Sequence, residues 1–226
     1  MKNLGRAFSF MFEDKDWIQK ILIGAAFVLL SCILIGIPLL LGYYLQLARR
    51  SAEGKELPLP DWDDLGGKFG KGLIFFIILI IYSIPLMILS FILSLIPCIG
   101  ILLCLIPFIA LALALPYLTV AYARSGDFNV AFEFDKMFEF IKENFTNVLI
   151  AVVMSWVLYF IAQFGALALL IGLLFTSFWA GLGTNYLYGQ VWWEAENKEG
   201  PVSVETPKIE GGTDSDDRGE TGSENR

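Results

Sequence analysis

The densest group of residues that could do chemistry is the segment LPLPDWDDLGG, at residues 57–67. Its carboxylates, Asp61, Asp63 and Asp64, are of the type that ligates divalent cations. If an EF-hand loop began at Asp61, however, its fifth and twelfth positions would be leucine and glycine, which carry no carboxylate. The segment therefore does not predict an EF-hand, and a metal-ligand interpretation rests on the three aspartates alone.

Helix capping explains the same residues more simply. Pro58 and Pro60 hold the chain extended, and either Asp61 or Asp63 caps a short interfacial helix whose N-terminal dipole favours carboxylates. Trp62 is expected at the level of the lipid headgroups, where tryptophan is enriched. Glycines in and after the segment allow close approach to another helix; they are Gly66, Gly67, Gly70 and Gly72. The candidate structural residues of this loop are Pro60, Asp61, Trp62, Asp63, Asp64, Gly66 and Gly67.

The rest of the chain offers little that could catalyse a reaction. It contains no histidine, and its long apolar segments contain no Asp, Glu, Lys or Arg. Ionisable residues within a membrane are the usual sign of proton relays and ion pathways, and a serine nucleophile would have no base there. The cysteines, Cys32, Cys98 and Cys104, lie in apolar stretches and are expected to pack as small apolar residues. We predict no catalytic residue, no cofactor and no bound metal.

The elements that position these residues follow from the charge distribution. Hydrophobic residues make up 56% of the chain and charged residues 17%, against about 25% charged in a soluble domain. Charges are absent from residues 21–48, 72–123 and 144–193. A spanning helix needs roughly 20 apolar residues, so these gaps hold one, two and two spans. The predicted fold is all-α: an integral membrane helical bundle of about five transmembrane helices, with short interfacial amphipathic helices.

Three domains are predicted along the chain: an N-terminal interfacial segment, a transmembrane helical domain and a disordered acidic tail, at 1–20, 21–193 and 194–226. The predicted spans are about 21–47, 72–96, 100–123, 147–163 and 166–191. Turns are expected at Pro97–Gly100 and Gln163–Gly165. The tail carries 10 acidic and 4 basic residues, a composition that repels nucleic acid and is typical of disorder.

The two polar loops resemble each other. In each, a tyrosine stands seven residues before an Arg-Ser pair, and an aromatic-Asp pair follows. This pattern predicts a degenerate repeat of an interfacial helix plus a membrane segment. The matched residues are Tyr43 and Tyr117, Arg50 and Arg124, Trp62 and Phe134, and Asp63 and Asp135. Phe134 and Asp135 are therefore added to the candidate interfacial residues.

Every Lys and Arg lies outside the predicted spans. With five spans, the positive-inside rule places both polar loops and the C-terminus in the cytoplasm and the N-terminus outside. Pro38 would then kink the first span near its middle. In an alternative topology the first apolar run is re-entrant, broken at Gly36-Ile37-Pro38, and residues 1–20 lie on the cytoplasmic side as well. The predicted location in either case is the cytoplasmic membrane of a prokaryote.

Three segments together resemble a known family. They are the residues Phe12, Asp14, Asp16 and Trp17 before the first apolar run, the spacing from Tyr43 to Arg50, and the motif LPxPDWDDLGGxFxxGL at residues 57–73. The pattern is similar to a domain of unknown function in archaeal and bacterial multi-pass membrane proteins and covers about residues 5–195. The resemblance implies a fold and a location, but no activity and no catalytic residue.

Three functions remain open from the sequence. The first is non-enzymatic membrane organisation, or the binding of a partner or lipid, by the cytoplasmic interfacial helices. The alternative is a small permease or the membrane subunit of a transporter. The third is a lipid-headgroup enzyme that uses Asp61, Asp63 and Asp64. The expected partners are the lipid bilayer and either another membrane protein or a second copy of the chain, with no nucleic acid.

Overall fold

The computed structural model describes residues 4–96 and 100–197, and within them every regular element is a helix. The predicted turn at Pro97–Gly100 therefore lies largely outside the described residues, as does the tail from residue 198. The α-helices are α1 (Arg6–Ser9), α2 (Trp17–Leu30), α3 (Gly36–Ala52), α4 (Leu65–Ser94), α5 (Gly100–Leu103), α6 (Leu105–Ser125), α7 (Phe134–Glu143), α8 (Phe145–Gln163) and α9 (Leu169–Glu196). The 3-10 helices are η1 (Phe10–Glu13), η2 (Ser31–Ile33), η3 (Phe128–Phe132) and η4 (Phe164–Ala168).

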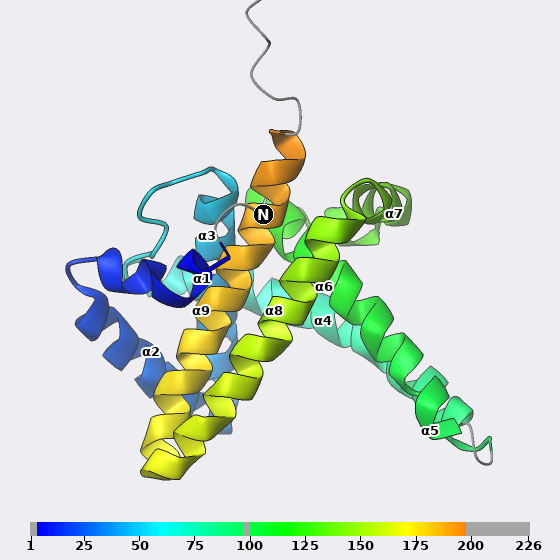
Figure 1. The fold of residues 1–226 in the computed structure, drawn as a ribbon, viewed down its shortest axis with the longest axis horizontal. Coiled ribbons are helices and arrows are strands. Elements are labelled where there is room, and N and C mark those ends of the chain that lie inside the picture. The colour runs from blue at the N-terminus through cyan, green and yellow to red at the C-terminus, as the bar shows by residue number, and fades with distance from the viewer. Residues whose placement is uncertain (1–3, 97–99, 198–226) are drawn as a thin grey trace, which may run out of the picture.

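The helices form three hairpins whose open ends lie on one side of the molecule (Figure 1). The first hairpin is α2–α3, the second runs from α4 through α5 to α6, and the third is α8–α9. The second hairpin diverges from the other two, so its tip at α5 lies apart from the turn between α8 and α9 (Figure 1). This arrangement confirms the predicted all-α membrane bundle.

The first hairpin corrects the prediction of a single span at 21–47. Helix α2 ends at Leu30 and α3 begins at Gly36, and the two ends of the apolar run are held together. Lys20, at the start, forms an ion pair with Asp61 (2.8 Å), and its carbonyl accepts a hydrogen bond from Trp62 (2.9 Å). The run therefore returns to the face from which it enters, as in the re-entrant alternative, and the N-terminal segment shares that face with the loops.

The reversal depends on a left-handed residue and a glycine. Leu34 has a φ of 67°, and a Cβ at Gly36 would lie 2.1 Å from the carbonyl oxygen of Phe27, so only glycine fits. Pro38 does not kink a long span as predicted, because it stands at the third residue of α3. In a first helical turn the missing N–H of proline costs no hydrogen bond.

Among the residues that the structure describes, three helices are long and apolar enough to cross a membrane: Leu65–Ser94, Leu105–Ser125 and Phe145–Ala166. A fourth candidate is the pair Arg6–Glu13 and Trp17–Ile33, which is bent by 113°. In the first of these helices only 17% of the most apolar window is buried inside the protein. Its apolar surface thus has the area and composition to face lipid, and three to four candidate spans lie within the described residues.

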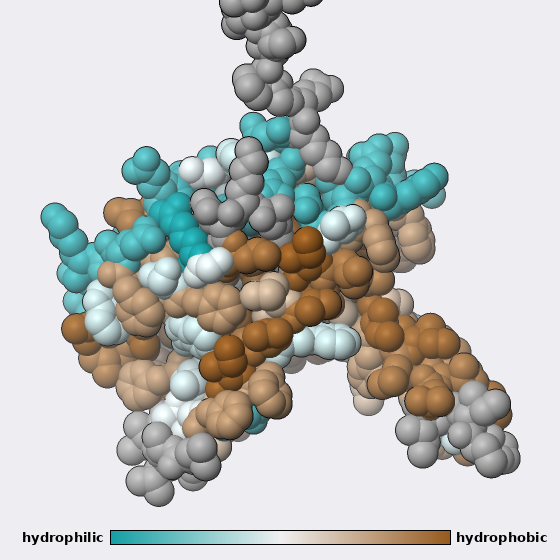
Figure 2. Space-filling model, viewed as in Figure 1, coloured by the Kyte–Doolittle hydropathy of each residue, from teal (hydrophilic) through white to brown (hydrophobic). Residues whose placement is uncertain are grey.

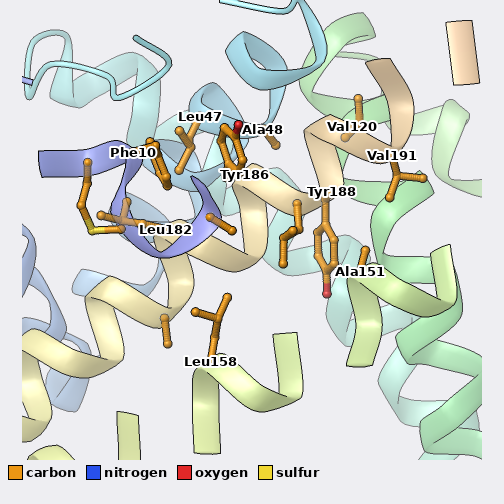
Figure 3. Close-up of a cluster of buried hydrophobic side chains, with 14 of the residues drawn as sticks. Phe10, Leu47, Ala48, Val120, Ala151, Leu158, Leu182, Tyr186, Tyr188 and Val191 are labelled. Carbon is orange, nitrogen blue, oxygen red and sulfur yellow. The ribbon is translucent and has the colours of Figure 1, made fainter. Parts of the chain in front are cut away.

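Helix α9 forms the centre of the main core. Its side chains Leu182, Tyr186, Leu187 and Val191 are almost completely buried among residues of α1, η1, α3, α6 and α8 (Figure 3). The Tyr186 ring stacks on Phe10 with 4.5 Å between ring centroids. Residues 4–13 thus pack partly inside the bundle, whereas the predicted N-terminal interfacial segment would rest among the headgroups.

The molecular surface divides into a hydrophilic layer and two diverging apolar legs, which are the lower parts of the helical hairpins. Figure 2 shows hydrophilic residues along one side and hydrophobic residues over the two diverging legs below it. Helix α7 lies at the edge of the hydrophilic layer and exposes Phe134 (49%) and Phe138 (66%) on adjacent turns. Such an amphipathic helix is suited to the boundary between headgroups and acyl chains.

Candidate functional site

The candidate site is built on the polar loop between α3 and α4. Pro58, Leu59 and Pro60 are buried, and two side chains of α3 hold their backbone. The Tyr43 hydroxyl donates to the Pro60 carbonyl (2.7 Å), and the Arg50 guanidinium donates to the Leu59 carbonyl (3.2 Å). The two residues that repeat with a spacing of seven thus face one loop and fix its path.

Trp62 is half-buried and packs against the bundle, and its position at the level of the headgroups stays a prediction. Its ring stacks on Tyr43 with 4.1 Å between centroids and lies 4.8 Å from Phe27 and 6.0 Å from Phe178. Its indole N–H donates to the Lys20 carbonyl. Because these neighbours come from α2, α3 and α9, Trp62 joins the loop to three helices.

The aspartates on either side of Trp62 pair with buried lysines. Lys20 has a side chain only 9% exposed and forms ion pairs with Asp14 (2.7 Å) and Asp61 (2.8 Å). Lys68, 5% exposed, pairs with Asp63 (2.7 Å). The hydrogen bond from Lys68 lowers the pKa of the Asp63 carboxyl, which keeps it ionised at neutral pH. Both carboxylates therefore neutralise lysines, which a buried cation requires.

The helix cap is Asp64, not Asp61 or Asp63 as predicted. Its Oδ1 accepts a hydrogen bond from the Gly67 amide (3.0 Å), and its φ of 41° turns the chain into α4. The capped element is the 30-residue α4 rather than a short interfacial helix. The prediction failed because three aspartates stand in one tetrapeptide, and the pairing of two of them with lysines depends on the tertiary fold.

The glycines of this region have different roles. A Cβ at Gly72 would lie 1.8 Å from the Pro38 carbonyl oxygen, and one at Gly42 would lie 1.9 Å from that of Lys68. Helices α3 and α4 therefore cross with backbone against backbone, as small residues permit in membrane bundles. Gly66 has open space around its Cβ position, whereas Gly67 faces the Asp64 carboxylate.

The second loop does not reproduce these contacts. Phe134 is 49% exposed, and the centroid of its ring lies 6.2 Å from that of Tyr82. Asp135 stands in the first turn of α7, where a carboxylate favours the helix dipole. The structure therefore does not bring Phe134 and Asp135 together with the residues of the first loop.

Between the first loop and the helices lies a polar cleft of about 300 Å³. Its walls come from α3, from the start of α4 and from the end of α6 at Tyr122 and Ala123. Sequence reasoning missed the lining residues Gln46, Arg50 and Lys71, because the first two lie on α3 and Lys71 lies on α4, 21 residues after Arg50. The available signal was the position of Lys71, the last charge before the 52-residue uncharged stretch.

Several polar groups of the described residues hydrogen-bond or pair within the protein. No group of three or more potential metal ligands occurs within residues 4–96 and 100–197. Ser51 donates to the Tyr186 carbonyl (2.9 Å) and accepts from Gln190 (3.2 Å). Burial opposes the charge of Glu53, yet hydrogen bonds from Arg49 and Lys55 lower the pKa of its carboxyl.

The long uncharged stretches of the helices and the charged face at which these helices begin or end define a multi-pass helical membrane protein. Residues 25–171 match the family described as protein of unknown function DUF4013, and the chain belongs to this family. The match confirms the expected membership in an uncharacterised domain family and takes in the first loop, the whole second hairpin and parts of the other two. No curated protein and no solved structure matches the chain.

Proposed function

We propose that this protein is a non-enzymatic organiser of the cytoplasmic leaflet of a prokaryotic membrane, acting through lipid or partner contacts at its polar face. The observation that supports it best is the first hairpin, whose ends meet at the Lys20–Asp61 ion pair. Helices α2 and α3 contain 14 and 17 residues, or about 21 and 26 Å at 1.5 Å per residue. Each is shorter than the ~30 Å hydrocarbon layer.

A hairpin of this length stops short of the opposite headgroups, so it displaces more lipid from the leaflet that it enters than from the other. The long helices α4, α6 and α8 displace lipid from both leaflets, so they anchor the protein without favouring one side. The first hairpin therefore makes the insertion asymmetric. Such asymmetry couples a protein to lipid packing and curvature, as it does for interfacial helices.

The orientation follows from the positive-inside rule. Within residues 4–96 and 100–197, Lys and Arg occur in segments 4–20, 49–71 and 124–142. Contacts hold these segments on one face: Arg6 donates to the Glu56 carbonyl (2.5 Å), and Tyr122, two residues before Arg124, donates to the Lys71 carbonyl (3.2 Å). Placing this face in the cytoplasm satisfies the rule, and it puts the C-terminal end of α9 there as well.

Reconstitution into vesicles tests the proposal. The full chain is inserted at increasing protein-to-lipid ratio, and vesicle curvature is measured by electron cryomicroscopy, with Gly36→Ala as the variant that opens the first hairpin. Leu34→Gly is the matched control, since glycine adopts the φ of 67° without strain. We expect the wild type and Leu34→Gly to increase curvature and Gly36→Ala to do so less at equal helicity.

Two results would contradict the proposal. One is vesicle curvature that is the same with and without the protein. The other is a flux of small solutes into vesicles that contain this chain alone, which would favour the permease.

A further inference from the structure

The polar cleft between α3 and α4 has an excess of positive charge. Its lining contains five Lys or Arg residues and three carboxylates, which leaves a net charge of +2. The carboxylates are committed within the protein: Asp63 to Lys68, Glu53 to Arg49 (2.8 Å) and Lys55 (3.0 Å), and Asp64 to the Gly67 amide. Of the five cations, three form ion pairs with these carboxylates and two do not.

Those cations are Arg50 and Lys71. Arg50 donates one hydrogen bond, to the Leu59 carbonyl, and forms no ion pair with a carboxylate of the described residues. Lys71 is exposed, and it forms no ion pair with a carboxylate of residues 4–96 or 100–197. The start of α4 adds the positive end of its dipole to the cleft. An anion in the cleft would thus meet two cations that no ion pair satisfies.

A third group in the cleft indicates which polar group of a ligand would lie beside its anionic group. Gln46 lines the cleft, and its Oε1 is buried without a hydrogen-bond partner. A buried polar atom of this kind costs free energy until a partner reaches it. A ligand that carries a hydroxyl next to its anionic group would satisfy Gln46 as well as the cations.

The position of the cleft decides the source of the anion. Arg49 is the first charge after the uncharged stretch 21–48, and Lys71 is the last charge before the stretch 72–123. The lining residue Ala123 ends that second stretch, directly before Arg124. The cleft therefore lies where α3, α4 and α6 pass from the apolar to the polar layer. Phospholipid headgroups occupy this level. A volume of about 300 Å³ is at the lower end of the range for small-molecule sites.

We propose that the cleft between α3 and α4 binds the headgroup of an anionic phospholipid, with its phosphate at Arg50 and Lys71 and a headgroup hydroxyl at Gln46. This site rests on the proposed lipid-organising function and gives it a ligand. The leaflet-organising activity of the first hairpin does not require the site. The two can therefore fail separately.

The test measures lipid bound to the full chain in nanodiscs. The discs contain phosphatidylcholine with a minor fraction of phosphatidylglycerol, and the retained lipid is counted by native mass spectrometry. The variants are Lys71→Gln, which changes an exposed side chain, and Arg50→Gln. The matched control is Lys15→Gln, which removes an exposed cation of the same face that does not line the cleft.

We expect each cleft variant to weaken phosphatidylglycerol binding about fivefold, the usual effect of one Lys or Arg near an anionic headgroup. Lys15→Gln should leave it unchanged. Thermal unfolding of each variant separates a lost site from a lost fold. The proposal is overturned if Lys71→Gln binds as the wild type does, or if Lys15→Gln loses as much. It is also overturned if soluble glycerol phosphate competes fully with the lipid.

Discussion

The two polar loops have similar sequences but different environments. In the first loop, Trp62 stacks on Tyr43, and its N–H bonds to Lys20. At the matched position in the second loop, Phe134 is 49% exposed. The difference arises because α2, α3 and α9 surround the first loop, whereas α7 lies at the edge of the bundle. Residue spacing predicts where a loop enters a hairpin, but the neighbouring hairpin determines whether its aromatic residue is buried.

The largest expected effect comes from the helix crossing beneath the first loop. Gly72→Ala would push a methyl group into the Pro38 carbonyl and should cost about 3 kcal/mol of unfolding free energy. Gly70→Ala is the control, since nothing lies within 4 Å of its Cβ position. Unfolding in mixed micelles measures both. Equal stabilities of the two variants would show that the backbone contact is not required.

Replacing Trp62 and Phe134 tests whether the two loops differ in the burial of their aromatic residue. Trp62→Ala should destabilise the protein by about 2 kcal/mol, because it removes a partly buried ring from three helices. Phe134→Ala should change the stability by less than about 0.5 kcal/mol, as expected at an exposed position. The same unfolding assay applies. If Phe134→Ala were the more damaging variant, the loops would not differ as described.

Replacing Lys20, which pairs with the first loop, should cost more stability than replacing Lys136 of the second loop. Lys20→Met leaves Asp14 and Asp61 without their cation and should cost about 1 kcal/mol; the value is moderate because Asp61 is 61% exposed and screened by solvent. Lys136 is 68% exposed and pairs only with Glu133 three residues earlier, so Lys136→Met should cost under about 0.5 kcal/mol. If the two variants were equally stable, the Lys20 ion pairs would not stabilise the fold.

The smallest expected effect is the dependence of stability on pH. The lowered pKa values of Glu53 and Asp63 stabilise the fold above the pKa of the unfolded carboxyls, and this contribution is lost as the pH falls through the folded values. The chain has no histidine. The free energy of unfolding should therefore be constant from pH 6 to 8 and decrease only below about pH 4. Asp63→Asn should reduce the acid dependence, whereas a transition near pH 6.5 would contradict the prediction.

Much of the fold could be predicted from the sequence, because charge is costly in hydrocarbon and its absence marks the apolar helices. The reversal after α2 remained one of two open topologies, because Leu34 adopts a positive φ although it is not the glycine that usually signals one. The candidate site was predicted only in part. The Pro-Asp-Trp-Asp segment stands out locally, but the cleft joins Gln46 to Lys71 across a helix crossing, and no local pattern reports such a contact.

The central claim is that the first apolar run returns to the face from which it enters. Single cysteines test it most directly, in a background where the three native cysteines are replaced by alanine, with labelling of intact cells by an impermeant reagent. We predict that Lys15→Cys and Lys55→Cys are both protected until the cells are permeabilised. Ser94→Cys, near the tip of the second hairpin, should be labelled from outside. Labelling of Lys15→Cys in intact cells, together with protection of Lys55→Cys, would contradict the account.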